Sequence, residues 1–298
     1  FKLTTFTREA GKNVSDAILS LRGQGAKKFI FDLRFNGGGL LSEAVNISSL
    51  FIPKGSEVVS TRGKVKQWNE VFKTNSLPIS VDEPIVMLVN GRSASASEIV
   101  SGIMQDYDRG LLVGSQTYGK GLVQATMKTA YNSQVKVTTA KYYIPSGRCI
   151  QAIDYTNKDE NGKALKFADS LSVEFMTKNG RKVYDGKGLS PDIQTSSEPY
   201  PLVVYSLLNK DLIFDYATKF YYSHDTIISP KEFKFIDFQD FEEWITTKDY
   251  DYKVSAEIAL EKFKESVAKD STFNFDKEFL AFKEKIKNQK KGDILKAK

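Results

Sequence analysis

The sequence predicts an α/β core with a largely parallel sheet, followed by a β-rich segment and a mainly helical C-terminal extension. Three observations lead to this fold class. In the first part of the chain, short apolar runs such as PIVMLV at 84–89 alternate with stretches of helical periodicity, as in βαβ units. Residues 121–193 then carry strand-like runs separated by turns. Residues 202–298 contain no Arg, many Lys and Glu, and apolar positions at helical spacing.

The elements of the predicted core follow from the period of their apolar residues. Val14, Ile18 and Leu21 recur at helical spacing, whereas KKFIFDL is a compact apolar run typical of a buried strand. NGGG at 36–39 predicts a tight turn between that strand and the next helix. We expect strands at 1–6, 27–33, 57–62, 65–72, 84–89 and 110–117, and helices at 8–22, 40–51 and 97–107.

The later segments predict a second architecture and a domain boundary. Asn179-Gly180 is a strong signal for a two-residue hairpin turn. The composition changes after Pro191 and the SSEPYP stretch, so we expect a core domain at 1–195 and a helical extension at 196–298. We expect strands at 122–130, 134–144 and 175–184, and helices at 202–208, 212–222, 255–267 and 279–286.

Composition excludes several classes of protein. The net charge of +6 is dispersed over the first two thirds of the chain, without the basic stripe of a nucleic-acid-binding protein. The longest apolar runs are too short to span a bilayer. The single Cys149 cannot form an internal disulfide, and the Cys and His clusters of a zinc site are missing, so we expect no metal or cofactor.

No signal peptide is visible, and the opening FKLTTFT predicts a strand, so we expect a fragment or a processed form.

The stretch NGRSASASEIV at 90–100 places three serines before a predicted helix, at the carboxyl end of a predicted strand. Such strand ends are where open α/β sheets bind ligands. Ser95 with Glu98 also fits a capping box, in which the serine caps the helix. From this stretch alone, a capping role for Ser95 is favoured over a nucleophilic one, and Ser93 and Ser97 are equivalent candidates.

TYGKGLVQ at 117–124 places Lys120 between two glycines. A lysine whose ammonium is destabilised can act as a general base and activate a serine without a histidine. Gln124 could accept a hydrogen bond from that lysine and fix its direction. The alternative is a solvated surface lysine in a glycine turn. GKG is not a P-loop, because the upstream glycine spacing and the following Ser or Thr are missing.

DLRFNGGGLL at 32–41 combines a strand end, three glycines and a helix start. Uncovered backbone N–H groups at a helix N-terminus suit an anion, such as a phosphate or a developing oxyanion. The pattern lacks the GxGxxG spacing of a dinucleotide site, and a tight turn of purely structural importance is the alternative.

Together, N-GGG, SASASE and GKGxxQ in this order resemble the C-terminal processing peptidases, or tail-specific proteases, of serine peptidase family S41. The resemblance covers about residues 1–195 and includes LFIPKG, YYIPSGR and GKGLSPDI. It implies a ClpP/crotonase-like peptidase core. It also implies that the chain is a serine endopeptidase that hydrolyses peptide bonds near protein C-termini through a Ser–Lys dyad and an acyl-enzyme.

The resemblance assigns a role to each matching residue. Ser95 would be the nucleophile, Lys120 the general base and Gln124 the residue that orients the lysine. The oxyanion hole would use the backbone N–H groups of Ala96 and Gly39, the latter in preference to Gly38. Ser93 and Ser97 become supports, and the single histidine, His224, becomes a surface or packing residue of the extension. Because a lysine accepts a proton only when neutral, activity should rise with pH.

The resemblance also sets expectations about partners and location. It implies protein or peptide substrates with exposed C-termini, no nucleic acid, and a periplasmic place in the bacterial cell envelope. Nothing in the chain matches the PDZ domain that usually precedes this core, and the helical extension is a second departure, which could mediate self-association or dock an adaptor. Two alternatives stay open: a catalytically inactive peptide-binding fragment or scaffold that uses the same groove, and an acyl-CoA-type hydratase or isomerase.

Overall fold

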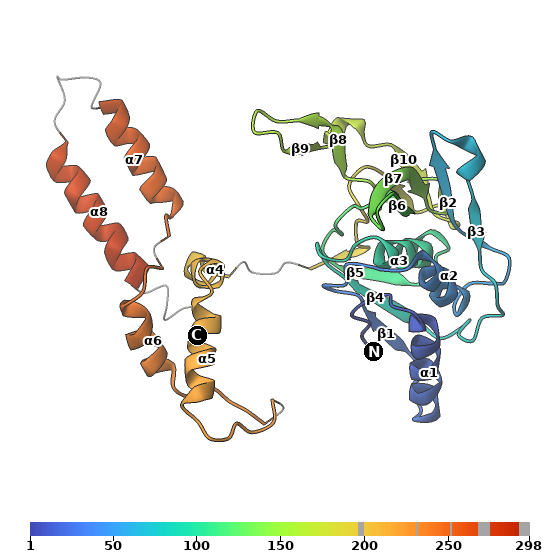
Figure 1. Cartoon of the computed structure of the whole chain (residues 1–298), viewed down its shortest axis with the longest axis horizontal. Helices are drawn as coiled ribbons and strands as arrows, with labels where there is room; N and C mark the ends of the chain where they lie inside the picture. Colours follow the sequence, from blue (N-terminus) through green and yellow to red (C-terminus); the bar gives the residue numbers. More distant parts are fainter. Residues whose placement is uncertain (196–199, 231, 251, 268–274, 292–298) are drawn as a thin grey trace. The chain divides into compact units, whose positions relative to one another are not determined.

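The computed structural model describes residues 1–195, 200–230, 232–250, 252–267 and 275–291. The chain divides into two compact units, Phe1–Ser196 and Ser197–Lys298. Their elements are labelled in Figure 1. The boundary that the composition predicts, between 195 and 196, lies beside residues 196–199, which are outside the described residues.

Unit 1 is built around a parallel sheet. Its strand order is β1-β4-β5-β12, where β1 is Phe29–Asp32, β4 is Ile85–Val89, β5 is Leu111–Gly114 and β12 is Ile193–Gln194. Phe29 pairs with Ile85 and Val86 pairs with Leu111, so β4 lies between β1 and β5. All three neighbouring pairs are parallel, as the alternation of strands and helices predicts. The carboxyl ends of β1, β4 and β5 therefore lie at one edge of this sheet.

Three helices of unit 1 contribute to one hydrophobic core: α1 (Ala10–Gly23), α2 (Leu41–Ser49) and α3 (Ala96–Asp106). Alternate residues of β1 are buried, with Phe31 inaccessible to solvent and its neighbour Ile30 exposed. This alternation is expected where only one face of a strand is covered. Helix α3 is buried along its whole length.

A second, antiparallel sheet has the strand order β3-β2-β7-β6. Strand β6 (Leu122–Lys128) forms one edge, pairing with β7 (Gln134–Tyr143), which pairs with β2 (Glu57–Gly63). Strand β3 (Val71–Lys73) forms the other edge. The remaining strands are β8 (Ile153–Lys158), β9 (Ala164–Lys166), β10 (Glu174–Met176) and β11 (Lys182–Tyr184), and the short 3-10 turns are η1 (Lys66–Trp68) and η2 (Asp169–Leu171).

Two strand predictions in the core are wrong. Residues 1–6 form only isolated bridges, Lys2 with Asp32 and Phe6 with Gly39, because the chain beside them leaves the extended conformation at the glycine turn. Residues 65–72 form a 3-10 turn and only the first part of β3, because the exposed run 64–71 has no buried face to stabilise a strand.

The predicted two-residue turn at Asn179-Gly180 is also wrong. Strand β10 ends at Met176 and β11 begins at Lys182, and Thr177 N–H donates to Arg181 O at 2.9 Å, so the turn spans the three residues 178–180 instead of two. The Asn179 N–H donates to Asp108 Oδ2 at 2.6 Å, so a tertiary contact fixes this loop and overrides the local turn preference.

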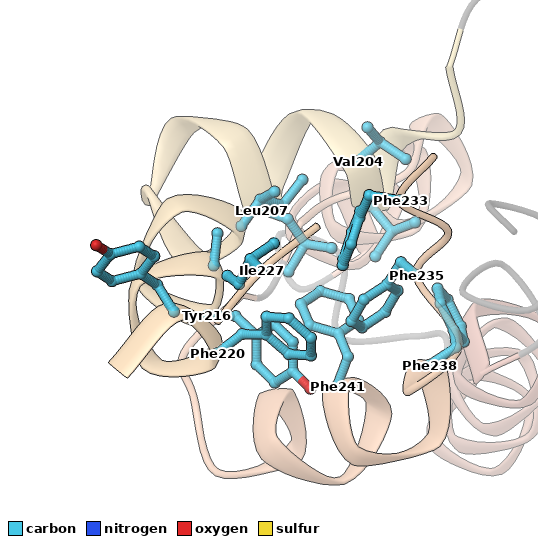
Figure 2. Close-up of a pocket in the computed structure, with 13 residues that line it drawn as sticks. Val204, Leu207, Tyr216, Phe220, Ile227, Phe233, Phe235, Phe238 and Phe241 are labelled. Carbon is cyan, nitrogen blue, oxygen red and sulfur yellow. The ribbon is translucent and has the colours of Figure 1, made fainter. Parts of the chain in front are cut away.

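Unit 2 is helical, with α4 (Leu202–Asn209), α5 (Leu212–Tyr222), α6 (Phe238–Thr246), α7 (Ser255–Val267) and α8 (Asp276–Lys291). Helix α6 is not among the sequence predictions. A separate core of Val203, Leu207, Leu212 and Ile245 holds part of this unit together. Aromatic side chains of α5, α6 and the segment between them line an apolar cavity of about 520 Å³, shown in Figure 2. No helix in the described part of the chain is both long and apolar enough to cross a membrane.

Candidate active site

Three loops that the sequence singles out follow the carboxyl ends of neighbouring parallel strands. The glycine turn at 36–39 follows β1, the serine loop at 93–97 follows β4, and the lysine loop at 117–121 follows β5. Backbone hydrogen bonds join them, because Ala94 N–H donates to Asn36 O at 3.0 Å and Tyr118 N–H donates to Ser93 O at 3.1 Å. The strand order of the sheet thus brings together segments that are far apart in the sequence.

The three loops and the antiparallel sheet enclose a pocket of about 260 Å³. Every residue for which the sequence predicts a catalytic or oxyanion-binding role lies on its wall. The lining residues are Gly39, Leu40, Leu41, Ser95, Ala96, Ile99, Lys120, Leu122, Val123, Gln124, Lys136 and Tyr142.

Ser95 is the N-cap residue of α3 and sits in an unusual backbone conformation. Its φ is 58° and its ψ is −118°, which for a residue with a side chain costs about 1–3 kcal/mol. Glu98 makes its half of the predicted capping box, because the Ser95 N–H donates to Glu98 Oε2 at 2.9 Å, whereas the Ser95 side chain makes no cap hydrogen bond. The strained turn directs a half-buried serine into the pocket at the positive end of a helix, a position that favours a developing negative charge.

The two outer serines of SASAS have structural partners instead. Ser93 Oγ donates to Leu33 O at 2.8 Å, and Ser97 Oγ donates to Asn36 O at 2.9 Å. Both serines are inaccessible to solvent, and neither lines the pocket. Ser93 and Ser97 therefore tie the serine loop to the glycine turn, and Ser95 alone of the three faces the pocket.

The glycine turn approaches the serine loop so closely that a side chain would not fit. A Cβ on Gly38 would lie 2.8 Å from both Ser95 Cβ and Ala96 N. Gly38 is buried, and its N–H donates to Asn36 Oδ1 at 2.9 Å. Gly39 is exposed on the pocket wall, and among the described residues its N–H has no acceptor, which is also true of the Ala96 N–H.

Glu98 connects the serine loop to the lysine loop, a role beyond the helix cap that the sequence suggested. Its side chain is inaccessible to solvent, and Oε2 accepts hydrogen bonds from the backbone N–H groups of Ser95 and Lys120, both at 2.9 Å. Oε1 accepts from Thr117 Oγ1 at 2.5 Å and from Gly119 N–H at 2.7 Å. Burial raises the pKa of the Glu98 carboxyl to about 7, and the four hydrogen bonds oppose that rise. The Ser-x-x-Glu spacing could have indicated this residue, but not its second set of donors.

Lys120 is positioned through its backbone. Its N–H donates to Glu98, and its carbonyl accepts a hydrogen bond from the hydroxyl of Tyr142, a buried residue of β7. The Lys120 ammonium forms no hydrogen bond to Ser95 or Gln124 within the described ranges, although all three side chains line the same pocket. Hydrogen bonds of a general base are often long or poorly aligned before a substrate is bound, so this geometry does not exclude Lys120 as a candidate base.

Gln124 reaches the pocket because of an irregularity in the β6–β7 pairing. The register shifts between Val123 and Gln124, so that Val123 pairs with Ala140 while Gln124 pairs with Thr138. Both consecutive residues line the pocket as a result.

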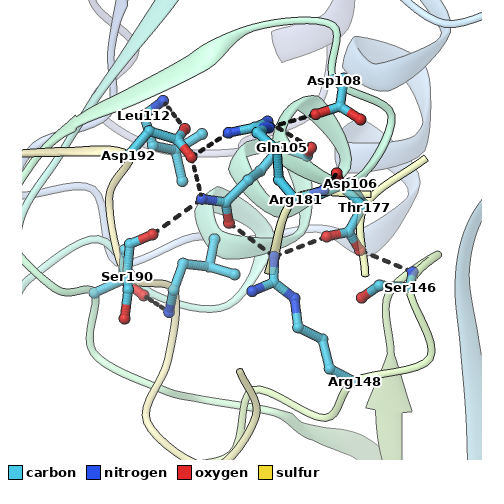
Figure 3. Close-up of polar contacts among 12 residues, drawn as sticks. Gln105, Asp106, Asp108, Leu112, Ser146, Arg148, Thr177, Arg181, Ser190 and Asp192 are labelled. Atoms are coloured by element: carbon cyan, nitrogen blue, oxygen red, sulfur yellow. Dashed lines mark hydrogen bonds and ion pairs between the residues drawn. The ribbon is translucent and has the colours of Figure 1, made fainter. Parts of the chain in front are cut away.

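The far end of α3 is held by a buried polar network, shown in Figure 3. Asp106 and Arg148 form an ion pair at 2.8 Å with both side chains 1% exposed, and Arg148 also donates to Gln105 Oε1 at 2.8 Å. Arg181 from the hairpin loop binds Asp108 and Asp192. This network fixes the C-terminal end of the helix whose N-terminal end carries Ser95.

A metal site is not indicated in the parts of the chain that the structure covers, because no group of three or more His, Cys, Asp and Glu residues lies together there. His224 belongs to α5's C-terminal flank in unit 2, where its ring stacks on Phe220 at 4.0 Å and is exposed to solvent. The single histidine is therefore a surface packing residue, as the sequence predicts.

Comparison with known proteins decides the family. The family described as "Peptidase family S41" matches residues 1–161, which is more than half of the chain. This chain belongs to peptidase family S41. A second family, described as "Probable PDZ-protease, C-terminal helical domain", matches residues 203–298. The helical extension, which the sequence analysis treats as a departure from the family, therefore has a match of its own, and neither matched segment is a PDZ domain.

Individual relatives within S41 agree with this assignment. A carboxy-terminal-processing protease of Bartonella bacilliformis is 39% identical over 159 residues, which cover 52% of this chain and 36% of that protein. A probable CtpA-like serine protease of Staphylococcus epidermidis is 33% identical over 220 residues, covering 72% of this chain and 42% of that protein. The chain thus spans well under half the length of these relatives.

A solved structure is also similar. The photosystem II D1 C-terminal processing protease matches with a TM-score of 0.50 and 28% identity, over 67% of this chain and 42% of that one. The mixed α/β core is therefore an S41 protease fold.

Proposed function

We propose that this chain is a serine endopeptidase that hydrolyses peptide bonds near protein C-termini, with Ser95 as nucleophile and Lys120 as general base. The observation that carries the proposal is the shared pocket. Ser95, Ala96, Lys120, Gln124 and Gly39 come from the ends of β1, β4, β5 and from β6, yet all of them line one cavity. Family membership supports the same reaction class.

In the proposed reaction, Ser95 Oγ attacks the scissile carbonyl carbon while its proton passes to the neutral Lys120 amine. The carbonyl oxygen becomes an oxyanion that accepts hydrogen bonds from the Ala96 and Gly39 N–H groups. Collapse of this intermediate breaks the C–N bond, and Lys120 returns the proton to the departing amine. Water then attacks the acyl-enzyme with Lys120 again as the base, which releases the acid and restores Ser95.

Whether each backbone N–H group already has an acceptor supports this choice of oxyanion hole. Gly38 N–H is already bonded to Asn36, whereas the N–H groups of Gly39 and Ala96 have no acceptor in the described chain. Gly39 is also on the pocket wall, and Gly38 is not. Gly38 contributes instead by its small size, which lets the two donors approach each other.

Strand β6 offers a place for an extended substrate. It is the edge of the sheet β3-β2-β7-β6, and one side of its backbone has no strand partner in the described chain. An added strand would hydrogen-bond to that edge and fix the register of the scissile bond. The apolar side chains of Leu41, Ile99 and Leu122 would accept an apolar residue next to the cleaved bond.

Cleavage of an unfolded protein substrate tests the proposal. Ser95→Ala and Lys120→Ala should each abolish cleavage, whereas Lys27→Ala, which removes a lysine outside the pocket and outside β6, should not. Retained cleavage in either of the first two variants would rule out the dyad. Peptide binding without any cleavage by the unaltered chain would favour the inactive peptide-binding scaffold, and turnover of thioesters without peptidase activity would favour the hydratase or isomerase.

We also propose a periplasmic location in the bacterial cell envelope, which rests on the family resemblance and is tested by fractionating cells. A role of the helical extension in self-association or in binding an adaptor stays a prediction.

A further inference from the structure

The catalytic pocket contains a second lysine that the proposed reaction does not use. Lys136 of β7 lines the same cavity as Ser95 and Lys120. Its side chain is exposed, and no ion pair or hydrogen bond of its ammonium is found among the residues that the structure describes. Every other polar side chain on this wall has a part in the proposed reaction or, like Tyr142, holds the lysine loop.

Among the described residues that line the pocket, no acidic side chain neutralises Lys136. The residues that line the pocket include two lysines and no Asp or Glu. Residues 110–153, which contain the lysine loop and both strands of the β6–β7 hairpin, contain four Lys and one Arg but no acidic residue. Glu98 lies near this region, but its carboxylate is buried and already accepts four hydrogen bonds.

The strand register places Lys136 on the substrate side of the hairpin. Lys136 and Tyr142 are six residues apart on β7, so their side chains share a face, and both line the pocket. Lys136 pairs with Thr126, and Gln124 pairs with Thr138, two residues nearer the catalytic loops. Two residues of a strand span about 7 Å, which is also the spacing between alternate side chains of a peptide bound along β6.

We propose that Lys136 selects substrates that carry a carboxylate about two residues from the scissile bond. The inference rests on the proposed function, because it assigns a subsite to that reaction. An ammonium without an internal partner, in a site without an acid, gains a charge-assisted hydrogen bond from such a carboxylate. An acidic side chain and the α-carboxylate of a chain terminus offer the same chemistry.

Binding measurements on the full chain test this subsite without requiring turnover. The Ser95→Ala variant is titrated with fluorescent peptides that share an apolar residue at the cleavage position. One is neutral and amidated, a second set carries Glu in place of Gln at single positions, and a third set ends in a free α-carboxylate at those positions. We expect a carboxylate at one such position to tighten binding about five-fold, and to do so less at high salt. The second and third sets separate the two sources of the carboxylate.

Substitutions test whether Lys136 causes the preference for a carboxylate. Adding Lys136→Gln to the Ser95→Ala variant should bring the ratio of affinities for Glu and Gln peptides to about one, and Lys136→Glu should reverse it, so that Gln peptides bind more tightly than Glu peptides. Lys27→Gln removes an exposed charge before the amino end of β1, outside both the pocket and β6, and should keep the ratio. An unchanged ratio in Lys136→Gln, or equal binding of all peptides by the parent protein, would overturn the inference.

Cleavage of the same peptides by the chain with Ser95 intact separates this inference from the proposed function. Cleavage at equal rates with and without the carboxylate would contradict the Lys136 subsite and leave the peptidase proposal standing. A carboxylate preference in binding, with no peptide cleaved, would support the subsite and contradict the peptidase proposal.

Discussion

At the scale of residues, the structure separates three serines that the sequence presents as equivalents. Ser93 and Ser97 donate to backbone carbonyls of the glycine turn region, while Ser95 sits in a strained conformation beside that turn. A buried hydroxyl with a fixed partner stabilises a loop, whereas a strained residue on a pocket wall is typical of a functional site. The two kinds of serine should therefore respond differently to substitution.

Ser93→Ala and Ser97→Ala should each lower the free energy of unfolding by about 1–2 kcal/mol, because each leaves a buried carbonyl with one donor fewer. Ser95→Ala should not lower it, since the substitution removes no buried structural hydrogen bond of the hydroxyl. Urea denaturation of the three variants measures this difference. A loss of stability in Ser95→Ala as large as in the other two would contradict the distinction.

Glu98 should make activity sensitive to pH near neutrality. Its raised pKa of about 7 means that a fall in pH from 8 to 6 protonates most of the carboxylate. Protonation removes an acceptor that both the serine loop and the lysine loop use, so activity should fall with it. Because the ionised form is the active one, the loss occurs on the acidic side of pH 7.

A comparison of pH profiles isolates this effect. In Glu98→Gln no carboxylate titrates, so kcat/KM should be low at all pH values, and its fall from pH 8 to pH 6 should be about ten-fold smaller than in the unaltered chain. Glu43→Gln, at another buried glutamate of unit 1, should keep the full pH dependence. Identical profiles in Glu98→Gln and the parent would show that Glu98 does not set the acidic limb.

At the scale of elements, helix α3 is fixed at both ends by buried carboxylates. Glu98 holds its first turn to the lysine loop, and Asp106 holds its last turn to Arg148. An isolated charge in such a position is costly, whereas replacing both members of a buried pair by apolar residues is often tolerated. The Asp106–Arg148 pair should therefore behave as a unit.

Asp106→Leu or Arg148→Met alone should reduce the free energy of unfolding by about 3–5 kcal/mol, and the double variant should recover most of that loss. Chemical denaturation of the three variants gives the coupling energy. The exposed pair Glu174–Lys182 is the control, and removing its charges should change stability by at most about 1 kcal/mol. Additive losses at Asp106 and Arg148 would contradict the coupling.

Local patterns predicted most elements, and the failures have physical causes. The helices at α1, α2 and α3 and the strands at β1, β4 and β5 follow from apolar periodicity, because each packs on the same core. The turn at Asn179-Gly180 is mispredicted because the Asn179 N–H is bonded to Asp108, a residue distant in sequence. The sequence indicates only a helix-capping role for Glu98, because the other groups that donate to its carboxylate come from the distant lysine loop. Sequence pattern shows what a residue does locally, and its distant partners appear only in the fold.

At the scale of the whole molecule, the two units have separate cores. The main core cluster lies entirely between Phe6 and Leu189, and the smaller cluster of unit 2 lies between Val203 and Ile245. All residues of the pocket that contains Ser95 and Lys120 belong to unit 1. Unit 1 should therefore fold and assemble its pocket without unit 2.

A truncated chain of residues 1–195 should unfold cooperatively and bind the same peptides as the full chain in its Ser95→Ala form. Circular dichroism during thermal unfolding and peptide titration measure the two properties. The isolated segment 200–298 should bind none of these peptides and serves as the control. A truncated chain that is unfolded, or folded but unable to bind, would show that the pocket depends on the helical unit.

The central claim is that Ser95 forms the acyl-enzyme with Lys120 as its base, and trapping that intermediate tests it most directly. The chain is mixed with an activated peptide ester, quenched with acid, digested and analysed by mass spectrometry. We expect one acyl group, on Ser95, and none within the same time in Lys120→Ala. Acylation of Ser93, Ser97 or any other residue, or undiminished acylation of Ser95 in Lys120→Ala, would contradict the account.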